Sequence, residues 1–321
     1  MTDRIDAFLA RAGLADGPRR VLAGDMSTRR YLRAGGRIVM DADPAVAPPV
    51  EPFLDRAARL AGAGLSVPRI ECADPGRGLI AMEDLGDDLL SAVAARDPGA
   101  EGRLYAAAGR VLARLQAVPA DDLPDHADDM PERACWALDW YAPENLFQRA
   151  RAKDAVAALM EDLPGPRVMT HRDWHAENLV WLPHRDGDAR IGILDFQDAQ
   201  RGPADYDLAS LVRDVRRDVS PAAAEAALDA YCDASGRDRA TVEAGTALCA
   251  AQRNMRIFGN FARAAVTAGK TRYLDLLPRL HALWSADLAH PALGRAAPML
   301  RDLVPPPDAD RIRALRARAA A

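Results

Sequence analysis

Three polar side chains in the middle of the chain have the types and spacing that Mg²⁺-assisted phosphoryl transfer requires. Asp173 and Asn178 share one short stretch, and Asp195 directly follows the apolar run Ile191 to Leu194. One carboxylate can orient and deprotonate an acceptor hydroxyl, while an amide oxygen and a second carboxylate can hold Mg²⁺ on nucleotide phosphates. We therefore predict Asp173 as the catalytic base, with Asn178 and Asp195 as the metal ligands.

A β-hairpin is the element that would position these groups. Residues 178–182 and 190–194 are apolar runs, and the segment 183–189 between them is rich in turn-forming Pro, Asp and Gly. This hairpin would bring Asp173, Asn178 and Asp195 together at one end. Single residues of these types often only cap helices or make turns. The ordered pattern His-x-Asp-x-x-x-x-Asn, followed by a strand that ends in Asp-Phe, instead matches the kinase signature set.

The same residues carry a family resemblance. His171-Arg-Asp-Trp-His-Ala-Glu-Asn178 and Ile193-Leu-Asp-Phe-Gln-Asp198 resemble the aminoglycoside/choline phosphotransferase family, a branch of the protein-kinase-like fold. In that family a histidine at the position of His175 is typical. The resemblance implies that His171 packs to shape the catalytic loop, and that His175 supports Asp173 or faces the acceptor. It also implies ATP and Mg²⁺ as cofactors.

A narrower resemblance concerns the acceptor. Asp195-Phe-Gln-Asp-Ala199 followed by Gly202-Pro-Ala-Asp-Tyr-Asp-Leu-Ala-Ser-Leu211 is similar to the cell-wall amino-sugar kinases, which phosphorylate the anomeric hydroxyl of N-acetylmuramate and N-acetylglucosamine. Residues 252–263 and 269–274 resemble the C-terminal signature of the same group. In the family the acids of the Asp-x-Asp element anchor the catalytic loop. We accordingly expect Asp205 and Asp207 to be structural and to pair with Arg172 or Arg213.

The resemblance implies an α+β fold of two lobes. Residues 1–86 would form a small antiparallel β-sheet lobe that includes the hinge, and residues 87–321 a larger, mainly helical lobe with the catalytic loop. Apolar periodicity agrees with this division, because short strand patterns precede residue 86 and helical patterns follow it. We expect strands at 20–23, 31–33, 37–40, 69–72 and 78–82, and helices at 3–13, 53–63, 104–118, 221–235, 239–266 and 272–287.

The nucleotide-binding part departs from the kinase pattern at one position. The turn at 24–30 would cover the phosphates through backbone N–H groups and the hydroxyls of Ser27 and Thr28. A kinase-like third strand carries a lysine on the phosphates, yet here Met40 occupies that position. We hypothesise that Arg30 supplies the missing charge, with Arg29 as the competitor. Glu83 and Leu85 belong to the expected hinge, whose backbone would face the adenine.

Several side chains are candidates for acceptor binding. Asp198 could contact a second Mg²⁺ or a sugar hydroxyl. The lactyl carboxylate of N-acetylmuramate would require a cation, and the candidates, which the sequence does not rank, are Arg213, Arg253, Arg256 and Lys270. Each of these could equally pair with surface acids. Trp136 and Trp140 lie four residues apart, a spacing typical of core packing on a helix and compatible with stacking on a sugar ring.

Composition excludes some partners. The 321-residue chain has 49% hydrophobic and 28% charged residues, as ordinary globular proteins do, and a net charge of −5 (42 basic, 47 acidic), so no basic field would attract nucleic acid. The four cysteines, at positions 72, 135, 232 and 249, lack Cys-x-x-Cys spacing and suit a reducing compartment. Neither a signal pattern nor an apolar run of about 18 residues is present, so we predict a cytoplasmic protein without a membrane partner.

Two other functions fit parts of the sequence. The same fold could phosphorylate choline, an aminoglycoside or another small hydroxyl metabolite, and the acids between Asp121 and Asp129 would suit a cationic acceptor. Alternatively, the absent strand lysine would fit a pseudokinase that binds nucleotide without transfer. The complete set of Asp173, Asn178 and Asp195 argues against that alternative, because a scaffold has no use for all three.

Overall fold

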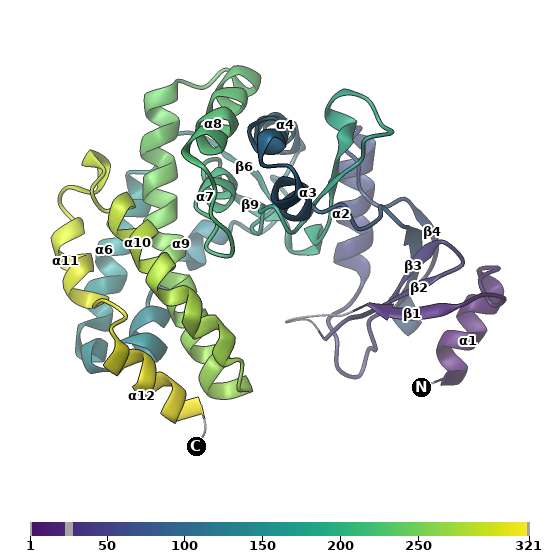
Figure 1. The fold of residues 1–321 in the computed structure, drawn as a ribbon, viewed down its shortest axis with the longest axis horizontal. Coiled ribbons are helices and arrows are strands. Elements are labelled where there is room, and N and C mark those ends of the chain that lie inside the picture. Colours follow the sequence, from purple (N-terminus) through teal and green to yellow (C-terminus); the bar gives the residue numbers. More distant parts are fainter. Residues whose placement is uncertain (1, 23–27, 320–321) are drawn as a thin grey trace. The chain divides into compact units, whose positions relative to one another are not determined.

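The computed structural model describes residues 2–22 and 28–319, and the chain forms two compact units (Figure 1). Met1–Pro98 and Ala176–Ala199 make up the first, here called the sheet unit. Gly99–His175 and Gln200–Ala321 make up the second, the helical unit. The lobe boundary predicted at residues 86 and 87 stays a prediction. The compact units group residues 87–98 and the hairpin region with the N-terminal segment instead.

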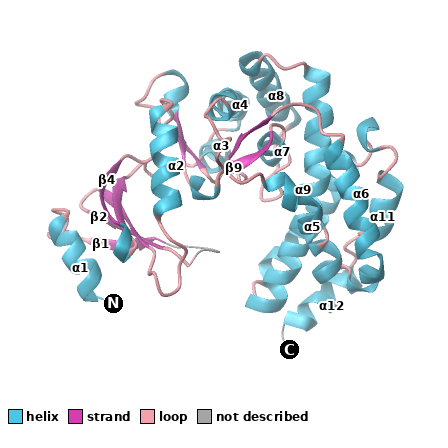
Figure 2. Cartoon of the chain, turned by 180° about the vertical axis from the view of Figure 1, so that it is seen from behind, coloured by secondary structure: helices cyan, strands magenta, loops and turns pink. Residues whose placement is uncertain are grey.

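The sheet unit contains the small antiparallel sheet that the sequence predicts. Its five strands run in the order β1-β2-β3-β5-β4, with all neighbours antiparallel. The bounds are β1 Arg19–Leu22, β2 Arg30–Ala34, β3 Arg37–Asp41, β4 Ile70–Asp74 and β5 Leu79–Glu83. Helix α1 (Thr2–Arg11) lies beside the sheet (Figure 2) and buries Phe8 and Leu9 against Ala34 and Val39.

Because side chains alternate along a strand, the two faces of the sheet differ. Leu32 and Ala34 of β2 belong to the cluster under α1. Tyr31, between Arg30 and Leu32, therefore points to the opposite face. It lies directly across from Met40 of β3, and Met40 in turn lies across from Ile80 of β5. This second face is the one that concerns the nucleotide site below.

Two helices and a hairpin complete the sheet unit. Helix α2 (Glu51–Gly62) has a proline in its first turn and buries Phe53, whose ring centroid lies 4.7 Å from that of Phe196. Strands β7 (Leu179–Trp181) and β8 (Ile191–Ile193) form the predicted hairpin. Ser66 holds it through two hydrogen bonds, from the Ile193 N–H to the Ser66 carbonyl (2.7 Å) and from the Ser66 hydroxyl to Ala189 (2.7 Å). Helix α3 is Leu90–Arg96.

The helical unit confirms the predicted α-rich character of the second part of the chain. Its strands β6 (Arg167–Thr170) and β9 (Gln200–Pro203) form one antiparallel pair. Its helices are α4 Glu101–Gln116, α5 Met130–Ala134, α6 Arg149–Glu161, α7 Tyr206–Val212, α8 Pro221–Ser235, α9 Arg239–Ala268, α10 Leu277–Asp287, α11 Ala297–Leu303 and α12 Ala309–Ala319. Together with the sheet unit these elements give the predicted α+β class.

Local signals explain both ends of α8 and the start of α10. The Ser220 side chain caps α8, and Gly236 ends it in the left-handed region at φ 68°. Helix α10 begins at Leu277, five residues later than predicted, because residues 271–276 form a 3₁₀ turn and a proline stands in the first turn of α10. Proline fits the first turn of a helix because no intrahelical N–H bond is lost there.

The core of the helical unit surrounds the long helix α9, drawn in green in Figure 1. Phe258 of α9 contacts Trp284 of α10 edge-to-face, with centroids 5.9 Å apart. Residues 137–141 form a π-helical turn, and Trp140 packs against this core, whereas Trp136 lies beneath the guanidinium of Arg263. Within the described part of the chain, no helix combines the length and apolar character that a bilayer crossing demands.

Candidate active site

Two candidate metal ligands meet at the open end of the β7–β8 hairpin. The Leu194 N–H donates to the Asn178 carbonyl at 2.9 Å, which extends the hairpin by one pair and places Asp195 immediately beyond it. Asp195 has a φ of 58°, in the left-handed region that non-glycine residues rarely adopt. In the described ranges only one other non-glycine residue has a positive φ, namely Arg172 in the catalytic loop. Backbone strain of this kind concentrates at functional sites.

Three further side chains lie near Asp195, namely Gln197, Tyr31 and Arg29. The Gln197 Nε2 donates to the Asp195 Oδ1 at 2.8 Å and to Asp198 at 3.4 Å, and its own Oε1 is buried without a donor among the described residues. Burial and then the charge of Asp195 raise the pKa of Tyr31 to about 12, against the opposing charge of Arg29. Tyr31 and Arg29 therefore lie close to Asp195.

This donor set fits Mg²⁺. Within residues 2–22 and 28–319, no group of three or more His, Cys, Asp or Glu side chains could hold a metal by itself. Mg²⁺ needs no such cage, because it keeps several waters and binds through one or two carboxylates and the substrate phosphates. Asp195 is exposed and Asn178 partly exposed, and the Gln197 Oε1 adds an acceptor oxygen beside them. Asn178 and Asp195 would hold the ion, as the sequence predicts.

The sheet unit also contains the residues predicted for the nucleotide. Met40 is fully buried between Tyr31 and Ile80, so the strand offers an apolar side chain where a kinase lysine would stand. Arg30 alternates with Tyr31 and thus lies on the α1 face, where it is exposed. Arg29, in contrast, is 8% exposed and lies near Tyr31. This placement favours Arg29 over the predicted Arg30 as the source of positive charge near Asp195.

The remaining predictions for the nucleotide stay untested. Ser27 lies outside the described residues, and Thr28 is exposed. Glu83, the last residue of β5, pairs through its side chain with Arg185 at 2.7 Å, and its backbone N–H donates to the Arg69 carbonyl at 2.9 Å. Leu85 lies over the hairpin strand β8, since a Cβ added to Gly192 would come within 3.0 Å of its Cδ1.

In the helical unit, the catalytic loop follows β6 and is held by Asp207 at the start of α7. The Asp207 carboxylate accepts hydrogen bonds from the backbone N–H of His171 at 2.5 Å and of Arg172 at 2.8 Å. His171 is buried, accepts the Asp173 N–H on Nδ1 at 3.3 Å, and meets the ring of Trp174 edge-to-face at 5.5 Å. These contacts fix the backbone on both sides of Asp173.

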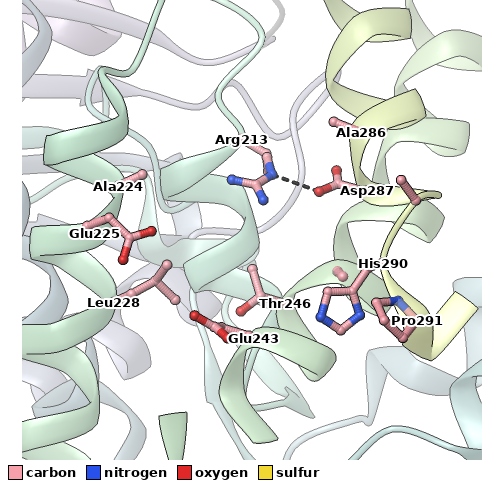
Figure 3. A pocket seen from close by; sticks show the side chains of 12 residues that line it. Arg213, Ala224, Glu225, Leu228, Glu243, Thr246, Ala286, Asp287, His290 and Pro291 are labelled. Carbon is pink, nitrogen blue, oxygen red and sulfur yellow. Dashed lines mark hydrogen bonds and ion pairs between the residues drawn. The ribbon is translucent and has the colours of Figure 1, made fainter. Parts of the chain in front are cut away.

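The predicted partners of the two acids were wrong in part. Asp205 pairs with Arg237 at 2.5 Å, and Asp207 binds the backbone N–H of Arg172. Arg213 pairs with Asp287 at 2.7 Å. Both residues line a cavity of about 400 Å³, where the guanidinium of Arg213 points at the Asp287 carboxylate (Figure 3). Arg213 is thus neutralised by a buried acid.

The Asp173 carboxylate is held in its ionised form. Its side chain is 44% exposed, and its Oδ1 lies 3.8 Å from Nη2 of Arg256. Desolvation by the surrounding protein opposes ionisation of this carboxyl. The positive charges of Arg256 and Arg253 outweigh that effect and lower the pKa of Asp173. Burial, and then the charge of Arg216, hold the pKa of His175 well below 6.5. At neutral pH an anionic base therefore stands beside a neutral imidazole.

The predicted set divides between the two units. The helical unit holds Asp173 with His171 and His175, whereas Asn178 and Asp195 belong to the sheet unit, and the chain passes from one to the other at Ala176. Asp198 is exposed beside Gln197. Arg253 and Arg256 lie with Asp173. Sequence reasoning missed Tyr31, Gln197 and Arg216. Strand register would have identified Tyr31, because it lies opposite Met40.

The fold and these residues define a protein-kinase-like phosphotransferase. The structure is similar to a choline/ethanolamine kinase family protein from Mesorhizobium loti (TM-score 0.63, 19% identity, covering 92% of this chain and 99% of that one). It is also similar to the ADP-bound aminoglycoside phosphotransferase APH(2'')-Ib (TM-score 0.61, 12% identity, 88% and 99% coverage). At these identities the likeness concerns the fold alone.

Sequence comparison establishes the family. The model of the phosphotransferase enzyme family matches residues 19–244, and the chain belongs to this family. The chain is 35% identical to the N-acetylmuramate/N-acetylglucosamine kinase of Caulobacter vibrioides, over 89% of this chain and 92% of the relative. It is 32% identical to the enzyme of the same name from Pseudomonas aeruginosa, over 88% and 87%. The resemblance inferred from the motifs is confirmed.

Proposed function

We propose that this phosphotransferase transfers the γ-phosphoryl group of ATP, with Mg²⁺, to the anomeric hydroxyl of N-acetylmuramate and N-acetylglucosamine. The observation that carries the proposal is the Asp173 carboxylate, half-exposed, kept ionised by two arginines and fixed on a loop that Asp207 clamps. The names of the relatives from Caulobacter vibrioides and Pseudomonas aeruginosa support the choice of acceptor. A cytoplasmic role in cell-wall sugar recycling follows as part of the proposal.

The chain's own groups have distinct roles in this reaction. Asp173 accepts a hydrogen bond from the sugar hydroxyl, orients its oxygen toward the γ-phosphorus, and takes the proton as the new P–O bond forms and the bond to ADP breaks. Neutral His175 can share a hydrogen bond with the acceptor without adding charge. Asn178 and Asp195 supply the oxygens for Mg²⁺, which, when bound, neutralises charge on the phosphates.

The charge beside Asp173 disfavours a cationic acceptor. Arg253 and Arg256 act on this carboxylate, so choline or an aminoglycoside would meet two guanidinium groups where it needs acids. A pseudokinase is disfavoured by the same geometry. An ionised carboxylate on a positioned loop is what a transferase needs to orient and deprotonate an acceptor hydroxyl, and a scaffold has no use for it together with Asn178 and Asp195.

³¹P NMR tests the proposal directly. Purified protein is given Mg-ATP with N-acetylmuramate or N-acetylglucosamine, and a sugar 1-phosphate resonance is expected with each. Asp173→Ala should lower turnover at least about a thousandfold, in line with the usual weight of a general base. Its folding is checked by circular dichroism, because Arg256 loses its counter-charge in this variant. Chelation of Mg²⁺ should abolish the signal.

The other outcomes are equally informative. Transfer to choline or an aminoglycoside, with neither sugar a substrate, would refute the acceptor assignment and leave the kinase activity. Nucleotide binding without transfer to any acceptor would establish the pseudokinase. Turnover by Asp173→Ala above about a thousandth of the wild-type value would refute the role of Asp173 as base.

A further inference from the structure

Helix α9 presents a buried polar stripe beside the catalytic base. Arg253, Arg256 and Asn260 follow the spacing i, i+3 and i+7 and therefore share one face of the helix. Arg253 is 2% exposed, and the side chain of Arg256 is 11% exposed. The Asn260 Oδ1 is buried without a donor in the described part of the chain.

The two arginines of this stripe differ in how they are compensated. Arg256 has the Asp173 carboxylate 3.8 Å from its Nη2, and only its Nε is buried without an acceptor among the described residues. Arg253 has buried Nε and Nη1 atoms for which residues 2–22 and 28–319 offer no acceptor. A buried guanidinium without its hydrogen bonds is costly, so a site of this kind is built for an anion that completes it. Burial lowers the pKa of Arg253, and the nearby charge of Arg256 acts in the same direction.

Most of the other buried acids of the unit are engaged in ion pairs or hydrogen bonds. Asp205 pairs with Arg237, and Asp287 pairs with Arg213. Asp207 accepts two backbone N–H groups of the catalytic loop, and Asp214 accepts the backbone N–H of Arg216 at 2.9 Å. Asp173 faces the charges of both Arg253 and Arg256, whereas Asp214, whose Oδ2 is buried without a donor among the described residues, feels the charge of Arg253. Because its side chain is 44% exposed, a ligand can approach the cluster from this end.

We propose that Arg253 binds a carboxylate of the acceptor and thereby favours an acidic amino sugar over its neutral counterpart. The inference rests on the proposed function and assigns specificity within the same site. Among the cationic candidates, Arg213 is excluded because Asp287 neutralises it. The Asn260 Oδ1, farther along the same face, is an acceptor suited to an acetamido N–H. Together these groups match the acceptor class that carries both a carboxylate and an N-acetyl group.

A substitution with two substrates tests this specificity. Arg253→Gln removes the charge and keeps hydrogen-bonding capacity, and its folding is checked by circular dichroism and melting temperature. We expect kcat/KM for N-acetylmuramate to fall about 10- to 100-fold more than kcat/KM for N-acetylglucosamine, the weight of a hydrogen bond to a charged group. Any loss shared by the two sugars reports the charge that Arg253 contributes beside Asp173. Arg253→Lys should restore part of the preference.

A matched control and a second measurement keep the inference falsifiable. Arg279→Gln removes an arginine of the same unit that pairs with exposed Asp218, and it should leave the ratio of the two kcat/KM values unchanged. Equal losses on both sugars in Arg253→Gln would overturn the inference and assign Arg253 to the transferring phosphoryl group or to folding. If the variant does not fold, the wild type is given N-acetylmuramate and its lactyl methyl ester.

The ester experiment has its own two outcomes. An ester kcat/KM at least about tenfold below that of the free acid supports carboxylate recognition, since esterification removes the charge and leaves the anomeric hydroxyl intact. Equal values overturn it. Failure of the wild type to phosphorylate any amino sugar would instead overturn the proposed function, and this inference with it. The two failures are therefore distinguishable.

Discussion

Replacing Asp207 by asparagine should separate the stability of the helical unit from its activity. The side chain is fully buried and accepts two backbone N–H groups, from His171 at 2.5 Å and from Arg172 at 2.8 Å. Asparagine has nearly the same shape but offers one acceptor and one donor. In the Asp207→Asn variant one of the two N–H groups would face an NH₂ group. The catalytic loop would therefore lose one of the two hydrogen bonds that hold it.

The effect on stability depends on pH in a direction that can be worked out. Burial raises the pKa of Asp207 from 3.8 to about 6, despite the opposing charge of His171 and the two N–H groups. The folded protein therefore holds this proton more tightly than the unfolded chain. The resulting contribution to stability is full below pH 3.8 and is lost as the pH rises through about 6. A shift of about two units corresponds to about 3 kcal/mol.

Asparagine has no proton to lose, so the variant should not show this decline. Relative to wild type, its free energy of unfolding should gain about 2 to 3 kcal/mol between about pH 4 and pH 7.5. Its kcat should nevertheless fall about 10- to 100-fold with little change in KM, because Asp173 loses its position. The assay is urea unfolding at several pH values with kinetics at pH 7.5. Exposed Asp186→Asn, in the hairpin turn, serves as the control. A stability difference that is constant over pH, or that moves in favour of the wild type, would refute the reasoning.

Two further predictions follow from the structure. Arg29→Gln should raise the KM for ATP about tenfold or more, as expected for loss of a charged contact, whereas Arg30→Gln should leave it within about twofold because Arg30 lies on the α1 face; initial rates against ATP concentration decide, and the reverse result would assign the role to Arg30. Gly109→Ala should lower the free energy of unfolding by about 1–3 kcal/mol, because the new Cβ would lie 2.4 Å from the Ala227 carbonyl oxygen where α4 meets α8. Gly102→Ala on the same helix has open space and should raise the melting temperature, so equal effects of the two changes would contradict the packing argument.

Local patterns predicted those elements whose causes are local. The bounds of α8 follow from a serine cap, a proline in the first turn and a terminal glycine, all readable in the sequence. The hairpin of Asn178 and Asp195 follows from two apolar runs around a turn segment. The division into units could not be predicted in this way, because it depends on where the hairpin packs. Ser66, more than a hundred positions earlier in the chain, holds that hairpin.

Ion pairs of the helical unit were predicted least well. Asp205 and Arg237 are 32 positions apart, and Arg213 and Asp287 are 74 apart. The sequence shows which acids need a partner but not which arginine reaches them, because a chain with 42 basic residues offers many. Tyr31 was missed for a related reason. Its importance comes from the register with Met40 and from the neighbouring Asp195, and neither is a feature of its own segment.

These pairings determine the sign of the charge where it matters. The whole chain carries a net charge of −5, which taken alone would suit a cationic acceptor. Within the helical unit, however, Asp205 and Asp287 are each neutralised by a distant arginine, and Asp207 is occupied by backbone N–H groups. These three buried acids therefore serve the structure and leave no free negative charge for a cationic acceptor. Arg253 and Arg256 remain beside Asp173, so the proposed catalytic base stands in a positive field that keeps it ionised and that, on our proposal, favours an acidic substrate.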